Sequence, residues 1–189
     1  LTSEEPDLPT PTPVVEAAVS ALQEGRTRYA PDGGLPELRT AITARYRKDF
    51  GVEFADDEVV VTSGGRHSLA LACQALLERG AEVIVPSPHW PPFPAAVRLV
   101  GARPIVVHAQ EDEGFQVTAR LVSKATSPKT QAVLLSSACN PTGAVMDAED
   151  LLVIGDMAGR RRFTILLDDS YARLLFRPEA AGTLQTLRD

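Results

Sequence analysis

Short apolar runs alternate with amphipathic stretches along the chain from residue 58 onward. Five runs predict buried strands, at Val59–Thr62, Glu82–Pro86, Pro104–Val107, Ala132–Ser136 and Thr164–Leu167. Helical spacing of apolar residues between them predicts helices at about 66–79, 92–100, 118–125 and 147–159. Alternating strands and helices indicate an α/β three-layer sandwich, with a mostly parallel sheet covered on both faces. No closing element follows Gly182, so we expect the sheet to be incomplete at the C-terminus.

The first 35 residues have a different character. Residues 1–13 are rich in proline and acidic residues, as in an extended arm. Val14–Gln23 has helical periodicity, and a loop containing Pro31 and Gly33-Gly34 follows it. A further helix is predicted from Pro36 to about Phe50. We therefore expect an N-terminal arm, helix and loop at residues 1–35 and the first part of a large domain at 36–189.

The composition excludes several classes of function. A formal net charge of −6 leaves no basic excess to neutralise phosphates, which argues against binding to nucleic acid or to an anionic membrane. The chain has no signal-peptide pattern at its start and no apolar run approaching the roughly 18 residues of a membrane span. Its two cysteines form no disulfide framework, so we expect a cytoplasmic protein. The three histidines have no metal-ligand spacing, and no metal is predicted.

Polar side chains follow two of the predicted strands. Asn140 lies in a Pro- and Gly-containing turn just after Ala132–Ser136, and Asp168 and Tyr171 follow Thr164–Leu167. Open α/β sheets bind ligands at the carboxyl ends of their strands, so these residues predict a binding crevice. A buried hydrogen-bonded pair without a catalytic role is the alternative for Asp168 and Tyr171.

Two further segments contribute to the same prediction. Ser63-Gly64-Gly65-Arg66 joins a predicted strand to a helix start, where backbone N–H groups favour an anion such as a phosphate; an ordinary tight turn is the alternative. Trp90 follows another strand and has the flat surface to stack on an aromatic ligand, although many tryptophans simply pack in cores. A carboxylate, an amide, a phenol, an indole and a phosphate-binding turn are together what pyridoxal phosphate requires.

The chain resembles the fold type I pyridoxal-phosphate enzymes, specifically the class I/II aminotransferases of the aspartate aminotransferase kind. The motifs that carry the resemblance span the sequence: Glu5-Pro6-Asp7, Tyr29, Gly34–Arg39, Gly64-Gly65, Pro88–Trp90, Asn140–Gly143 and Asp168–Tyr171. The resemblance implies that residues 36–189 begin the cofactor-binding large domain. It also implies a homodimer acting on amino acids and 2-oxo acids.

The resemblance implies a role for each matching residue. The backbone N–H groups of Gly65 and Arg66 would hold the phosphate, and Trp90 would stack on the pyridine ring. Asn140 and Tyr171 would hydrogen-bond to the ring hydroxyl oxygen, while Asp168 would pair with the ring nitrogen. Tyr29 would reach the phosphate in the partner subunit's site, and Glu4, Trp90 and Asn140 would contact the substrate.

Two features depart from the family pattern. Glu4 replaces the usual glycine before Glu-Pro-Asp, and our hypothesis is that it favours a cationic amino acid such as arginine or lysine. The family's Schiff-base lysine follows the Asp-x-x-Tyr motif by some tens of residues, whereas the chain has only Lys48, Lys124 and Lys129. We therefore expect a part of a longer enzyme that is inactive alone and has no catalytic residue of its own. The alternatives are another pyridoxal-phosphate reaction, such as elimination or cyclisation, or a non-catalytic aminotransferase-like module.

Overall fold

A four-stranded parallel sheet with helices on both faces forms the body of the protein. The computed structural model describes residues 8–176. The strands are β1 (Glu82–Ser87), β2 (Arg103–His108), β3 (Thr130–Ser136) and β4 (Thr164–Asp168), in the spatial order β2-β1-β3-β4. The helices are α1 (Thr12–Gln23), α2 (Pro36–Phe50), α3 (Gly65–Leu76), α4 (Pro92–Leu99), α5 (Ala119–Ala125) and α6 (Ala148–Arg161), with a 3-10 turn η1 (Asp56–Glu58).

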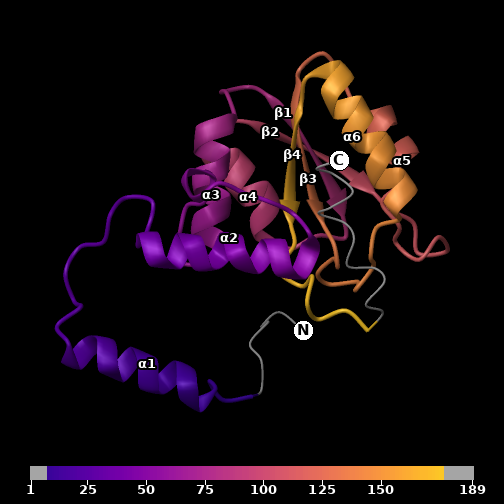
Figure 1. Ribbon diagram of the computed structural model, residues 1–189. Helices are drawn as coiled ribbons and strands as arrows, with labels where there is room; N and C mark the ends of the chain where they lie inside the picture. The colour runs from indigo at the N-terminus through magenta and orange to yellow at the C-terminus, as the bar shows by residue number, and fades with distance from the viewer. Residues whose placement is uncertain (1–7, 177–189) are drawn as a thin grey trace.

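The layers are visible in Figure 1, where α3 and α4 lie on one side of the sheet and α5 and α6 on the other. Residues of β1 alternate between the two faces: Val83 and Val85 face the α3–α4 layer, whereas Ile84 faces the α5–α6 layer. All three side chains are fully buried. Burial on both faces explains why the strand reads as one continuous apolar run, and the predicted α/β fold with a parallel sheet is confirmed.

The helices are held to the sheet by apolar side chains that their periodicity places inward. Val97 of α4 belongs to the core on one face, and Leu151 and Ile154 of α6 belong to the core on the other. All three are completely buried, which for side chains of this size stabilises the fold by about 1.5–3 kcal/mol each. Asp147 caps α6 by accepting a hydrogen bond from the Glu149 backbone N–H at 2.8 Å.

The prediction of a strand at Val59–Thr62 is wrong. The segment is extended but belongs to no sheet within the described residues; its backbone meets the loop before α2, where Val61 N–H donates to the Gly33 carbonyl at 3.0 Å. A run of β-branched residues forms a strand only where a neighbouring strand completes the hydrogen-bond ladder. Val60 remains 63% exposed accordingly. The remaining four predicted strands are confirmed.

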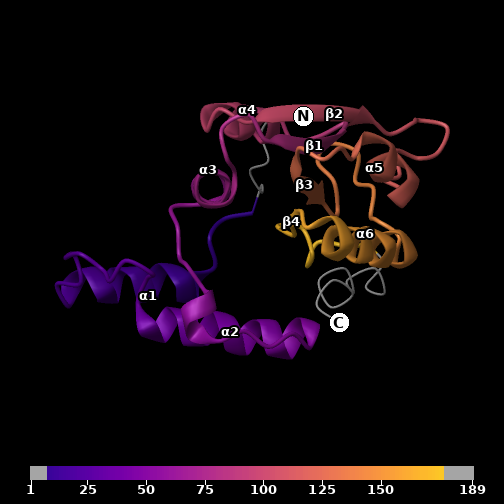
Figure 2. The ribbon, with the colours of Figure 1, turned by 90° about the horizontal axis from the view of Figure 1, so that it is seen from above.

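The N-terminal helix α1 stands apart from the sheet in both Figure 1 and Figure 2. None of its residues is buried, and its apolar side chains, including Val14, Val19 and Leu22, are exposed. Its amphipathic pattern therefore predicts the helix correctly, but no element within the described residues buries its apolar face.

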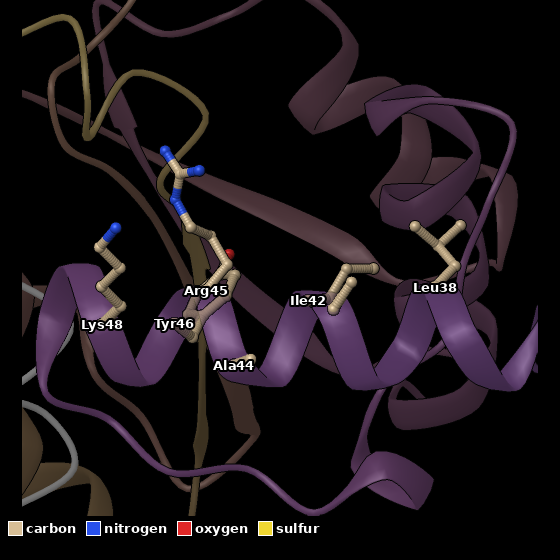
Figure 3. Close-up of a pocket in the computed structure, with 7 residues that line it drawn as sticks. Leu38, Ile42, Ala44, Arg45, Tyr46 and Lys48 are labelled. Carbon is tan, nitrogen blue, oxygen red and sulfur yellow. The ribbon is translucent and has the colours of Figure 1, made fainter. Parts of the chain in front are cut away.

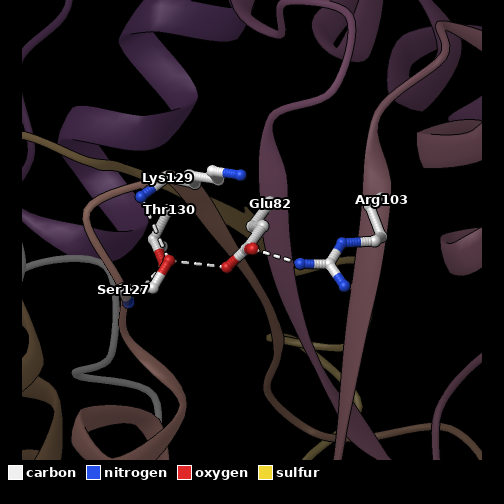
Figure 4. Close-up of polar contacts among 5 residues, drawn as sticks. All are labelled: Glu82, Arg103, Ser127, Lys129 and Thr130. Atoms are coloured by element: carbon white, nitrogen blue, oxygen red, sulfur yellow. Dashed lines mark hydrogen bonds and ion pairs between the residues drawn. The ribbon is translucent and has the colours of Figure 1, made fainter.

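A buried carboxylate joins the amino-terminal ends of three strands (Figure 4). Glu82 begins β1, is 6% exposed, and accepts a hydrogen bond from the Ser127 hydroxyl at 2.6 Å. It also forms an ion pair with Arg103 at the start of β2. The Ser127 hydrogen bond, followed by Arg103 and the charge of Lys129, lowers the pKa of Glu82. This cluster lies at the opposite edge of the sheet from the predicted crevice.

We predict that Glu82→Gln destabilises the fold at neutral pH and that the difference disappears in acid. The folded-state pKa lies below the unfolded one, so the ionised carboxylate stabilises the protein above the ordinary glutamate range of about pH 4–5 and loses its effect as the pH falls through the folded pKa. Urea denaturation of both proteins at several pH values measures this. Glu78→Gln, an exposed change nearby, serves as control; a Glu82→Gln deficit independent of pH would contradict the prediction.

Candidate functional site

The carboxyl ends of β1, β3 and β4 are connected to one another. The Cys139 thiol, just beyond β3, contacts the Pro88 carbonyl beyond β1 with a sulfur–oxygen distance of 3.4 Å. The Ser137 backbone N–H donates to the Asp168 carbonyl at the end of β4 at 3.2 Å. The polar residues predicted on separate strand ends therefore belong to one edge of the sheet, as the parallel order requires.

The turn that the sequence predicts to bind a phosphate, Ser63–Arg66, lies at the amino terminus of α3 and is called the phosphate-type turn below. Gly64 precedes the helix with φ +92°, a conformation that residues with a Cβ rarely adopt. The N–H groups of His67 and Ser68 donate to the Gly64 carbonyl, at 3.0 and 3.1 Å. Within the described residues, those of Gly65 and Arg66 have no backbone acceptor, as expected at a helix start. Open space around Gly64 and Gly65 leaves room for an anion there.

Trp90 connects this turn to the end of β1. The Arg66 guanidinium lies over the Trp90 ring, with its central carbon 5.6 Å from the ring centroid. Phe93 packs edge-on against the same indole, with 5.6 Å between ring centroids. Trp90 also packs against the α3–α4 core while remaining partly exposed. It is therefore a core residue that also borders the turn.

Asn140 lies in a tightly hydrogen-bonded turn after β3. The Gly143 N–H donates to the Cys139 carbonyl at 2.7 Å, and the Cys139 N–H donates to the Ala144 carbonyl at 2.8 Å. Gly143 has φ +73°, which allows the chain to reverse there. The Ser87–Pro88 and Asn140–Pro141 peptide bonds are both cis. The turn fixes the backbone of Asn140 and leaves its side chain half-buried.

Asp168 has one of its carboxylate oxygens already engaged. Its Oδ1 accepts hydrogen bonds from the Ser170 N–H at 3.1 Å and from the Ser170 hydroxyl at 2.6 Å. No described residue hydrogen-bonds to its Oδ2. The free oxygen on an oriented carboxylate is suited to pair with a ring N–H or another cationic donor.

Asp169 and Tyr46 are two polar residues near the site that the sequence did not single out. Burial raises the pKa of Asp169, and the adjacent charge of Asp168 raises it further; a hydrogen bond from Tyr46 acts in the opposite direction. Burial, then the charge and hydrogen bond of Asp169, raise the pKa of Tyr46. Two adjacent carboxylates, Asp168 and Asp169, are visible in the sequence and could have indicated a residue with a raised pKa. The contact of Tyr46 with Asp169 could not be foreseen, because the two residues lie far apart in the sequence.

The structure does not bring every predicted residue to this edge. Tyr29 is fully exposed, in the loop between α1 and α2, and Glu4 lies outside the described residues. The three lysines are all exposed. Lys124 lies in the last turn of α5 and Lys129 beside Glu82, so both are at the amino-terminal edge of the sheet, while Lys48 is on α2.

Residues 8–176 contain neither a candidate membrane-spanning helix nor a cluster of metal-binding side chains. No helix there is both long enough and apolar enough to span a membrane. The same residues contain no group of three or more His, Cys, Asp or Glu side chains that could hold a metal ion.

Comparison with known proteins places this site in a family. The profile of aminotransferases class I and II matches residues 1–189. The aspartate aminotransferase of Geobacillus stearothermophilus is 37% identical over 172 residues, which are 91% of this chain and 44% of that protein. A solved structure of a tetra mutant of Thermus thermophilus aspartate aminotransferase superposes with a TM-score of 0.91 at 40% identity, covering 94% of this chain and 49% of that one. The alanine aminotransferase of Pyrococcus furiosus gives a TM-score of 0.88 at 33% identity, covering 94% and 46%.

The chain belongs to the class I and II aminotransferase family, whose members use pyridoxal phosphate. The family resemblance and the fold expected from the sequence are thereby confirmed. The chain spans slightly less than half the length of the relatives described above.

We predict that Gly64→Ala destabilises the fold by about 1–3 kcal/mol, the cost of a backbone conformation open essentially to glycine alone, while Gly65→Ala does not. The two glycines are adjacent and both have open space around them, but only Gly64 has a positive φ, of +92° with ψ 168°. An alanine at Gly65 enters the first helical position without backbone strain. Urea denaturation of the two variants compares them directly; equal losses of stability would show that backbone strain at Gly64 is not the cause.

Proposed function

We propose that this chain is the cofactor-binding amino-terminal part of a pyridoxal-phosphate-dependent aminotransferase, which exchanges an amino group between an amino acid and a 2-oxo acid. The observation that supports it best is the convergence of the α3 amino terminus, Trp90, Asn140 and Asp168 at one sheet edge. Membership of the family supports this reaction class.

The described residues fit the cofactor. The N–H groups of Gly65 and Arg66 are available for the phosphate, in a turn with open space at the Cβ positions of Gly64 and Gly65. The partly exposed indole of Trp90 offers a face to an aromatic ring. The free Oδ2 of Asp168 offers an acceptor to a protonated ring nitrogen. The phosphate, the ring face and the ring nitrogen of the cofactor thus each have a matching group among the described residues.

Pyridoxal phosphate, when bound, supplies an electron-withdrawing ring that stabilises negative charge at the substrate α-carbon. Asp168 favours the protonated ring nitrogen because an adjacent negative charge stabilises the cationic form. Ser170 orients that carboxylate through its two hydrogen bonds. Asn140 and Tyr171 orient the ring through its hydroxyl oxygen, and Trp90 limits its motion from one face.

The remaining assignments extend beyond a single subunit. We infer a homodimer in which Tyr29 reaches the partner's phosphate site, because its fully exposed side chain is available to a second subunit. The division at residue 35, between the arm with α1 and the first part of the large domain, is part of the same proposal; α1 lies apart from the sheet in Figure 2. A role for Glu4 in choosing a cationic substrate and a cytoplasmic location, supported by the free thiols of Cys73 and Cys139, belong to the same proposal.

We predict that Asp168→Asn weakens pyridoxal phosphate binding to the full-length protein by about ten- to a hundredfold. The substitution keeps the shape of the side chain but removes the charge that pairs with the ring nitrogen. Titration followed by cofactor absorbance measures the dissociation constant. Asp156→Asn removes an exposed carboxylate on α6 and should leave binding unchanged. Equal affinities for wild type and Asp168→Asn would sink the assignment.

We also predict that the 189-residue chain alone catalyses no 2-oxo-acid-dependent loss of any amino acid. Lys124 and Lys129 lie at the far edge of the sheet, and Lys48, on α2, makes no polar contact with Trp90, Asn140 or Asp168 among the described residues, so we assign the reactive amine to a segment outside these residues. Adding pyridoxal phosphate and then borohydride should leave no single lysine specifically labelled, as read by peptide mass spectrometry. The full-length protein, tested in parallel, should show both turnover and one labelled lysine. Specific labelling of one of the chain's own three lysines would refute this assignment.

A further inference from the structure

Two side chains of α2 contact the segment that follows β4. The Tyr46 hydroxyl interacts with the carboxylate of Asp169, the residue directly after Asp168. Three residues further along α2, Asp49 forms an ion pair with Arg173 at 2.8 Å, and its side chain is only 16% exposed. The two contacts lie one helical turn apart on α2 and on either side of Tyr171 in the other segment.

The Tyr46 ring packs against aromatic side chains at and just beyond the end of α2. Phe50 and Phe54 pack against it, with ring centroids 5.4 and 5.6 Å away. Arg45 forms a further ion pair with Asp49, so the side chains in the last turns of α2 help to hold one another in place. Tyr46 also borders a shallow pocket along α2 together with Ile42 and Leu38 (Figure 3). The hydroxyl of Tyr46 is therefore directed by packing.

The segment that receives these contacts has little structure of its own. It consists of two turns, in which the Ala172 N–H donates to the Asp169 carbonyl at 2.9 Å and the Leu174 N–H donates to the Tyr171 carbonyl at 2.8 Å. Most of residues 170–176 are exposed or only partly buried. A segment with so few buried groups depends on its side-chain contacts for a fixed position.

The same helix is also tied to the segment that leads into the phosphate-type turn. Thr40 and Thr43 donate hydrogen bonds to the Asp56 carboxylate of η1, at 2.6 and 3.0 Å. Six residues separate η1 from α3, so the chain passes from this anchor directly to Gly64. Thus α2 contacts, through different side chains, the approach to the phosphate turn and the segment after Asp168.

We propose that Tyr46 and Asp49 are positioning residues for the cofactor, which hold the Asp168–Tyr171 segment in register with the phosphate-type turn through α2. The inference rests on the proposed function. Neither residue touches the cofactor in this proposal. Tyr46 acts through Asp169, which fixes the backbone next to Asp168, and Asp49 acts through Arg173, two residues beyond Tyr171.

The test uses Tyr46→Phe, Asp49→Asn and a control, Lys48→Gln, in the full-length protein. Tyr46→Phe keeps the aromatic packing and removes only the hydroxyl, while Lys48 is exposed on the same turn of α2. The first measurement, made without cofactor, is amide hydrogen exchange at Ala172 and Leu174. We expect exchange about fivefold faster in both variants and unchanged in the control, with β4 amides unaffected.

The second measurement is made with pyridoxal phosphate labelled with ¹⁵N in its ring. We expect about fivefold weaker binding in both variants and a ring-nitrogen titration, read from the ¹⁵N chemical shift, displaced to lower pH, because a less well placed Asp168 stabilises the protonated nitrogen less. A purely structural role would leave that titration where it is in wild type.

Two results would overturn the proposal: unchanged exchange at Ala172 and Leu174, or faster exchange with unchanged affinity and unchanged ring-nitrogen titration. Failure of the wild-type protein to bind pyridoxal phosphate would instead remove the proposed function. The exchange data separate the two cases, because they are collected without cofactor.

Discussion

The close packing of β1 against β3 at the centre of the sheet is the constraint on which the rest depends. Val83, Val85 and Ile84 of β1, with Val133 and Leu135 of β3, are buried on both faces of the sheet. Because each strand must satisfy two cores at once, a shift of register by one residue would exchange the two faces along its whole length. The fixed register then places the strand ends of β1 and β3 side by side, and Asp168 follows through the pairing of β3 with β4.

The two edges of the sheet have opposite characters. At the amino-terminal edge, Glu82 is satisfied by Ser127 and Arg103, as a buried carboxylate requires. At the carboxyl-terminal edge, the Oδ2 of Asp168 and the N–H groups of Gly65 and Arg66 have no such partners within the described residues. Fully paired polar groups stabilise a fold, whereas oriented groups with free donors and acceptors are what a ligand needs. This contrast supports the proposed cofactor site independently of the family comparison.

Much of the architecture was readable from local patterns. The double-sided burial of β1 and β3 appears as continuous apolar runs, and the cap at Asp147 appears as a carboxylate before a periodic stretch. The strand expected at Val59–Thr62 failed because strand formation depends on a neighbour, which no local pattern reveals. The contact of Tyr46 with Asp169 joins residues more than 120 positions apart, so it too was invisible before the fold was known. Gly65, Trp90, Asn140 and Asp168 were singled out because each lies at or near the end of a strand or at the start of a helix, and their roles toward a cofactor stay predictions.

The central claim is that groups from three strand ends and one helix start hold pyridoxal phosphate together. A crystal structure of the full-length protein with the cofactor tests this most directly. The account predicts the phosphate at the N–H groups of Gly65 and Arg66, the ring against Trp90, and the ring nitrogen about 2.7–2.9 Å from Asp168 Oδ2. A cofactor bound elsewhere, or a ring nitrogen that meets no carboxylate, would contradict it.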